Sequence, residues 1–317
     1  MKKINLLTGN WTDQEWKNRL AFRFNSENIP IYSQKQLEIT KVDNSQYLSN
    51  LQLRVDDSIF TLDWRHWTYD DDTFDDYIEK ISLVQPKIIA LFEYPFGIEM
   101  PKKVDAIQYF NKMIERTKKA CIKIKEKNKN AIILSPAITV IEEDTEHNYI
   151  DYFIQTQQFF DGYAVHCVNN MTEHTLGKLS SLLNRILSVS SKKIWVTKWA
   201  VPCFDGKVIN SSMIGELGWE PYNTKSAVSC LQRSFSIIES LSKGNTTWFY
   251  NGTCKDKYKP RTNPTPSEYW NYNSFPFIPN DFSYSWQYWH FLGLMTADGI
   301  IKEGLVSSLI SLAESNV

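Results

Sequence analysis

Short apolar runs alternate with longer amphipathic segments along this chain, and that alternation predicts β–α units built around a parallel sheet. Each short run has the length of one buried strand and is shorter than a typical helix. The expected strands are residues 4–8, 29–33, 58–63, 87–94, 131–138, 162–169, 192–199 and 246–252.

Apolar residues at three- and four-residue steps predict amphipathic helices between several of these strands. The segment from residue 34 to residue 57 has no clear period, so we expect only an irregular helix there. The expected helices are residues 12–25, 104–127, 172–188 and 225–241.

Eight strands separated by helical segments, in a chain of 317 residues, are typical of a (β/α)₈ barrel. The main alternative is a doubly wound sheet, which usually has a glycine-rich phosphate-binding turn after its first strand. The segment LLTGNWTD, at residues 6–13, has a single glycine, and no G-x-G-x-x-G or Walker pattern occurs. We therefore expect one α/β domain, a TIM barrel over residues 1–317, with an aromatic- and proline-rich loop at 255–280 after strand eight.

The amino-acid composition argues against two classes of binding partner, nucleic acids and membranes. The chain has 35 Lys and Arg against 36 Asp and Glu, which argues against nucleic acid and against a polybasic membrane anchor. No run approaches the ~20 apolar residues of a membrane span, and the N-terminal apolar run is too short for a secretion signal. We expect a cytoplasmic protein. The five cysteines lack the spacing of a metal site, so no metal is expected. No cofactor is expected either. The sequence leaves the oligomeric state open.

Candidate functional residues follow the predicted strands, because the active side chains of a barrel come from the C-terminal ends of its strands. Carboxylate, imidazole, amide and indole groups gather there. Such a mixture is typical of a sugar site, in which tryptophans stack on the ring and polar groups bind hydroxyls. Three other tryptophans, Trp16, Trp195 and Trp248, are expected to pack between barrel and helices. The candidates for a carbohydrate site are Trp11, Asp63, Trp64, Trp67, Glu93, His166, Asn169, Lys198, Trp199 and Tyr250.

Five segments carry a family resemblance through their order and spacing between residues 87 and 305. They resemble segments of the (β/α)₈ glycoside hydrolases that have catalytic glutamates on strands four and seven, a clan of xylosidase-, arabinosidase- and cellulase-like enzymes. The segments read KIIALFEYPFG, AIILSPAIT, DGYAVHCVN, KKIWVTKWAVP and FLGLMTADGIIKEGL.

The resemblance implies that Glu93 stands at the acid/base position, that His166 contacts substrate, and that Lys198 stands where the family has its nucleophilic glutamate. Phe92 also replaces the asparagine that usually precedes the acid/base residue. A retaining glycosidase needs two carboxyl groups ~5–5.5 Å apart. A lysine cannot form the glycosyl ester, and its charge would lower the pKa of Glu93 and weaken it as a proton donor.

Three interpretations of Lys198 remain, so whether the protein is an enzyme stays open. In the first, Lys198 pairs with Glu93, and the barrel binds a glycan or a protein partner without ordinary hydrolysis. In the second, Glu93 works with a different carboxylate in an inverting arrangement, or the substrate assists. In the third, Lys198 forms a Schiff base with a carbonyl substrate. The alternative carboxylates are Asp63, Glu142, Glu143 and Glu216.

Overall fold

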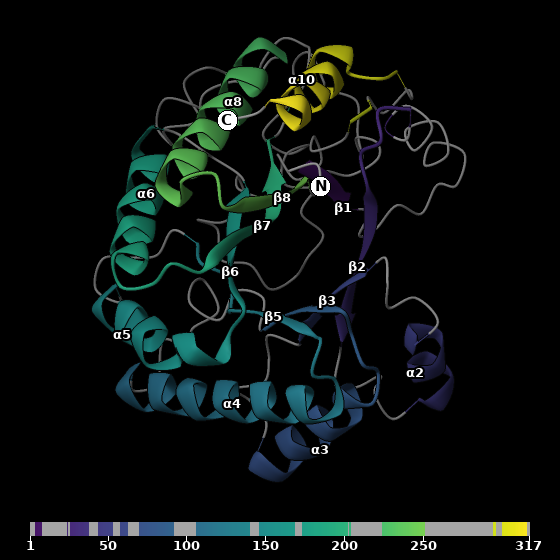
Figure 1. Cartoon of the computed structure of the whole chain (residues 1–317), viewed down its shortest axis with the longest axis vertical. Coiled ribbons are helices and arrows are strands. Elements are labelled where there is room, and N and C mark those ends of the chain that lie inside the picture. The colour runs from purple at the N-terminus through teal and green to yellow at the C-terminus, as the bar shows by residue number, and fades with distance from the viewer. Residues whose placement is uncertain are drawn as a thin grey trace, which may run out of the picture.

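A computed structural model of the chain contains a closed barrel of eight parallel strands that follow one another in sequence order, as Figure 1 shows. The predicted (β/α)₈ barrel is therefore confirmed. The strands are β1 (Ile4–Leu7), β2 (Ile31–Leu37), β3 (Ser58–Leu62), β4 (Ile88–Ala90), β5 (Ile132–Leu134), β6 (Gly162–Val168), β7 (Lys193–Ala200) and β8 (Thr246–Tyr250).

The structure describes the eight strands, the helices given below and some of the connections between them. The described residues are 4–7, 24, 26–37, 44–52, 58–62, 70–91, 106–139, 146–168, 173–201, 203, 224–250, 294–295 and 300–315. The loop predicted at 255–280 lies outside them, as does nearly all of the helix predicted at 12–25.

Helices surround the strands (Figure 1), and three of them lie where the apolar spacing predicts them, at 104–127, 172–188 and 225–241. The segment 34–57 was predicted to hold only an irregular helix, and the structure of its first residues is different. Strand β2 continues to Leu37, because its polar residues pair with β3 from Ser33–Ser58 through Leu37–Leu62. The described helices are α2 (Ser45–Gln52), α3 (Asp71–Ser82), α4 (Ala106–Lys127), α5 (Glu146–Thr156), the short 3₁₀ helix η4 (Gln157–Phe159), α6 (Glu173–Ser188), α8 (Thr224–Ser242) and α10 (Glu303–Glu314).

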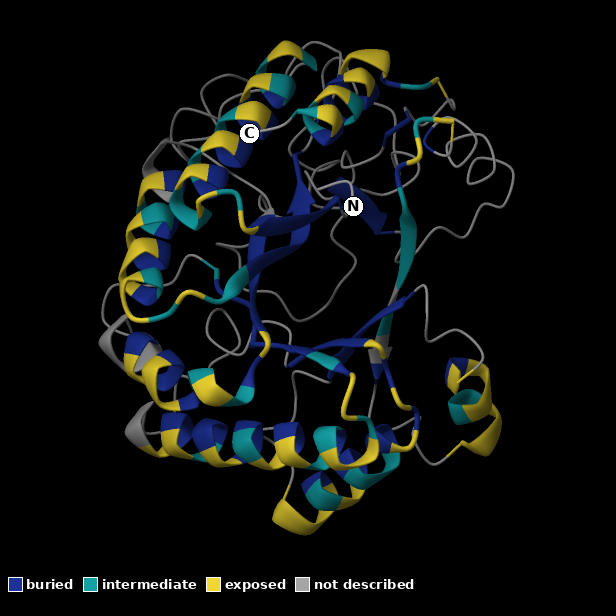
Figure 2. Cartoon of the chain, viewed as in Figure 1, coloured by how far each residue is buried: buried dark blue, intermediate teal, exposed yellow. Residues whose placement is uncertain are grey.

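Alternate residues of the strands belong to two apolar layers. One layer lies inside the barrel, and the other lies between the strands and the helices, where the helices turn their buried faces inward (Figure 2). The alternation follows from the two-residue period of a strand. The inner layer consists of Leu7, Ile59, Ile88, Ala90, Leu134, Ala137, Ala164, Trp195 and Phe249.

The outer layer continues into charged contacts between neighbouring helices. The buried Arg116 of α4 donates to Asp71 of α3 at 2.9 Å, and its guanidinium lies 4.6 Å from the centre of the Phe74 ring. Asp70 caps α3 by accepting a hydrogen bond from the Thr73 amide at 2.7 Å. The cap stabilises the start of α3, and the Arg116 contacts hold α3 against α4 on the outside of the barrel, away from the inner layer.

Candidate functional site

The end of β7 departs from regular pairing. Its register with β6 passes from Val165–Val196 directly to His166–Lys198, so β7 has one extra residue, Thr197, at this point. The pairing with β8 shows the same irregularity, between Val196 and Trp199. Two residues of β7 therefore stand where one is expected, which is a β-bulge.

The bulge decides which way Lys198 faces. Val196 and Trp199 both belong to the outer layer, so the two residues between them lie on the inner side of the strand. Strict alternation from the inward-facing Trp195 would instead have placed Lys198 among the apolar side chains under the helices. The bulge thus moves the only basic group in this part of β7 to the inside of the barrel.

The partner strand supports this orientation. Residues that pair in register in the β6–β7 ladder share a layer, as Ala164 and Trp195 do on the inside. His166 follows Ala164 by two residues and therefore faces inward, and its register partner is Lys198. The amine and the imidazole thus lie on adjacent strands, on the same wall of the barrel and near its C-terminal end.

Burial changes the acid–base properties of both groups. Lys198 is 8% exposed and His166 is 7% exposed. Desolvation lowers the pKa of Lys198 to about 7 and the pKa of His166 to about 3. At neutral pH the imidazole is consequently uncharged, and about half of the Lys198 side chains carry a neutral, nucleophilic amine.

Thr197 adds a hydroxyl group to the same wall. The residue is 5% exposed, and within the described part of the chain its Oγ1 atom has no hydrogen-bond partner. A buried hydroxyl without a partner costs free energy, about 1–3 kcal/mol. We call Thr197, Lys198 and His166 the inner-wall group: a hydroxyl, an amine and an imidazole that together suit a ligand with polar oxygens.

Among the predicted site residues, the structure brings together His166 and Lys198. Thr197 was not predicted, because a bulge depends on pairing with both neighbouring strands and the sequence of β7 alone does not specify it. The other predicted residues lie outside the described residues: Trp11, Asp63, Trp64, Trp67, Glu93 and Asn169.

Two predicted sugar-binding residues need correction. Trp199 is fully buried in the outer layer, where its ring centre lies 4.7 Å from that of Trp248 and its Nε1 donates to Ser234 Oγ of α8 at 3.0 Å. Tyr250 is 1% exposed and belongs to the same layer. Stacking on a sugar needs an accessible ring face, so neither residue supplies it. The bulge turns Trp199 outward, and the alternation of β8 does the same for Tyr250.

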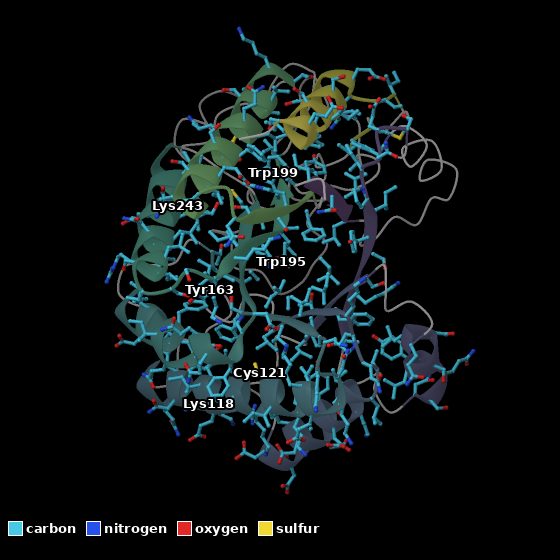
Figure 3. The ribbon with its side chains drawn as sticks, viewed as in Figure 1. Lys118, Cys121, Tyr163, Trp195, Trp199 and Lys243 are labelled. Carbon is cyan, nitrogen blue, oxygen red and sulfur yellow. The ribbon has the colours of Figure 1, made fainter. Side chains whose placement is uncertain are left out.

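Of the three tryptophans predicted to pack against helices, Trp16 lies outside the described residues, and the other two lie in different layers. Trp248 packs in the outer layer, as predicted. Trp195 instead lies inside the barrel (Figure 3). Its ring stacks on that of Phe249, with ring centres 6.1 Å apart and planes 11° apart. The indole of Trp195 thus fills the barrel on the N-terminal side of the inner-wall group.

Within the described ranges, no three His, Cys, Asp or Glu side chains are grouped so that they can hold a metal ion. In the same part of the chain, no helix has the length and apolar character needed to cross a membrane.

The barrel and its helices define the fold as a (β/α)₈ TIM barrel, and the solved structures that are similar to it include a xylanase and GH5_18 proteins. A thermostable mutant of the xylanase Xyn10A from Cellvibrio japonicus matches with a TM-score of 0.61, over 99% of this chain and 98% of that one, at 10% identity. A GH5_18 protein from Bifidobacterium longum subsp. infantis matches with a TM-score of 0.60, over 99% of this chain and 78% of that one, at 10% identity.

A third structure, GH5_18 from Streptomyces cattleya in complex with GlcNAc, matches with a TM-score of 0.57, over 100% of this chain and 82% of that one, at 8% identity. No protein-family model and no curated protein matches the sequence. Identities this low establish the fold alone.

Proposed function

We propose that this barrel binds a carbohydrate at the C-terminal ends of its strands and does not hydrolyse it by the ordinary retaining mechanism. One observation carries the proposal. Lys198 lies on the inner side of the barrel near the end of β7, and the sequence resemblance implies that the glycoside hydrolases have their nucleophilic glutamate at this position.

The chemistry of retaining hydrolysis explains why this residue matters. The nucleophile must be a carboxylate that forms a glycosyl ester, and the transition state carries positive charge on the sugar ring. A protonated Lys198 repels that charge, and a neutral Lys198 still cannot form the ester. Since its pKa is about 7, both forms are present at neutral pH and neither replaces the glutamate.

The acid/base position is affected by the same residue. In the family resemblance Glu93 must hold a proton in order to protonate the leaving oxygen. A lysine ammonium nearby stabilises the carboxylate and lowers its pKa. The proposal therefore includes an ion pair between Lys198 and Glu93 whenever the lysine is protonated.

The remaining groups suit a ligand rich in hydroxyls. Thr197 offers a buried hydroxyl, and His166 offers an uncharged imidazole that donates from one nitrogen and accepts at the other. Stacking is assigned to Trp64 and Trp67, after the predicted third strand, because Trp199 is engaged elsewhere. The similar structures include a GH5_18 protein solved with GlcNAc, which makes a saccharide the natural first ligand to test.

A glycan array combined with a broad screen of aryl glycosides tests the proposal. The wild type is expected to bind at least one glycan and to turn over none. The variant Lys198→Glu restores a carboxylate at the end of β7, whereas Lys129→Glu makes the same charge change at an exposed turn before β5 and is the control.

The outcomes separate the interpretations. Binding without turnover by the wild type supports the proposal, and measurable turnover gained only by Lys198→Glu supports it further. Steady turnover by the wild type that Glu93→Gln abolishes would overturn it in favour of hydrolysis with a different carboxylate. A wild type that neither binds nor cleaves any saccharide would overturn the assignment to carbohydrate.

A further inference from the structure

The inner-wall group has the parts that amine chemistry on a carbonyl carbon requires. Lys198 supplies the amine, Thr197 the adjacent hydroxyl, and His166 an imidazole on the next strand. All three are buried, and the bulge in β7 is what places the first two side by side on the inner face. A lysine in the outer layer would meet apolar side chains and no ligand.

We propose that Lys198 forms a reversible imine with an aldehyde that enters the C-terminal end of the barrel, either a small aldehyde or the open-chain form of a reducing sugar. This activity goes beyond glycan binding. It shares the location of the proposed site but does not require the chain to recognise an intact glycan.

The reaction balances without an oxidant or a cofactor. The Nζ lone pair attacks the carbonyl carbon, a C–N bond forms, and the C=O π electrons move to oxygen. A proton passes from nitrogen to that oxygen, giving a carbinolamine. The C–O bond then breaks with loss of water, so that one amine and one aldehyde give one imine and one water molecule.

The neighbouring side chains suit these steps. The Thr197 hydroxyl, which none of the described side chains or backbone groups engages, is placed to hydrogen-bond the carbinolamine oxygen. His166 faces the same interior and is uncharged at neutral pH, so it adds no positive charge beside the amine and offers a polar contact to the carbinolamine oxygen. From β8 the inner face presents Phe249, which excludes water without adding charge.

The protonation state of Lys198 also favours the reaction. Only a neutral amine attacks a carbonyl group, and an ordinary lysine with a pKa near ~10.4 is almost entirely protonated at pH 7. A pKa of about 7 gives Lys198 a neutral fraction roughly a thousand times larger. A second buried lysine, Lys302, donates to the Cys203 carbonyl oxygen and serves as an internal comparison.

Reductive trapping tests the inference. The full-length protein is incubated at pH 7 with glycolaldehyde and sodium cyanoborohydride, which converts an imine to a stable secondary amine, and the labelled peptides are mapped by mass spectrometry. Xylobiose, which has a reducing end, replaces glycolaldehyde in a second series. We expect Lys198 to be labelled at least ten times faster than Lys302 or the exposed Lys129.

The pH dependence gives a second readout. Labelling of Lys198 is expected to rise between pH 6 and pH 8 and then level off, whereas labelling of ordinary lysines continues to rise toward pH 10. Lys198→Arg, which keeps a cation but cannot form an imine, is expected to lose the fast-labelled peptide. Thr197→Val is expected to slow labelling several-fold.

Two results would overturn the inference. One is labelling of the wild type spread evenly over its lysines, and this result needs no variant to fold. The other is a fast-labelled site that persists in Lys198→Arg. The glycan array measures binding of intact saccharides and therefore tests the proposed function independently of the imine. Trapping without glycan binding would contradict only the proposed function. Glycan binding without trapping would contradict only imine formation.

Discussion

Lys198 and His166 are register partners across the parallel pair β6–β7, so two basic side chains lie next to each other inside the barrel. Both are buried, and burial depresses the pKa of both. Two protonated groups at this spacing would repel each other in a medium of low dielectric constant. His166 is uncharged over the whole physiological range, so a protonated Lys198 meets no second positive charge on β6.

Stability should therefore depend on pH through Lys198. Its pKa is about 7 in the folded chain and ~10.4 in the unfolded chain, so the unfolded state binds the extra proton between these values. Stability then rises with pH in this window, by roughly 4 kcal/mol over its full width. We expect the free energy of unfolding of the wild type, measured by chemical denaturation from pH 7 to pH 10, to rise more steeply than that of Lys198→Met.

The control for that measurement is Lys129→Met, which removes an exposed lysine and should follow the wild-type curve. Lys198→Met should be the more stable protein at pH 7, and its advantage should shrink as the pH approaches 10. Parallel curves for the wild type and Lys198→Met would mean that Lys198 keeps an ordinary pKa in the folded protein.

Trp199 should behave as a core residue. It is fully buried against Trp248 and Phe235, and its Nε1 bonds to Ser234. Replacing a buried tryptophan with alanine costs about 3–5 kcal/mol, because the lost contacts leave a cavity. We expect Trp199→Ala to lose that much in chemical denaturation, while Trp199→Phe, which keeps most of the ring, loses less than half as much. A Trp199→Ala protein with wild-type stability and impaired glycan binding would restore the stacking role that its burial argues against.

The barrel could be predicted from the sequence, because the period of apolar residues along the chain indicates which residues are buried. The eight runs became eight strands in order, and the longest amphipathic segment became α4. Strand β2 was predicted too short because Gln34 and Gln36 belong to no apolar run. Its pairing with β3 comes from contacts distant in sequence, which a local pattern does not contain.

The site was predicted less completely, and the bulge is the physical reason. Strict alternation along β7 assigns Trp195 and Trp199 to one face, whereas the extra residue at Thr197 puts them in different layers. A bulge depends on pairing with both neighbouring strands, so residues of a single strand do not specify it. Lys198 was identified through a family resemblance, and its inward orientation follows from the bulge.

The start of β6 offers a matched pair of glycine substitutions. A Cβ atom added to Gly162 would lie 2.8 Å from the Trp195 indole and 2.9 Å from the Lys193 carbonyl oxygen, whereas one added to Gly177 in α6 meets nothing within 4 Å. Overpacking of this kind costs about 1–3 kcal/mol. We expect Gly162→Ala to lower the thermal midpoint and Gly177→Ala to raise it, since alanine is the better helix former by about 1 kcal/mol. A neutral Gly162→Ala would indicate that Trp195 moves freely inside the barrel.

We expect the Thr197 hydroxyl to lower the stability of the fold and to contribute to ligand binding. Valine has nearly the shape of threonine and lacks the hydroxyl, whose Oγ1 has no hydrogen-bond partner in the part of the chain that the structure covers. Removing an unsatisfied buried hydroxyl should stabilise the protein by about 1 kcal/mol. The matched control Thr197→Ser keeps the hydroxyl, loses a methyl group, and should be less stable than Thr197→Val while retaining ligand binding. Chemical denaturation measures the first effect, and affinity for a glycan found on the array measures the second. A destabilised Thr197→Val with unchanged affinity would show that the hydroxyl serves the fold and does not contact a ligand.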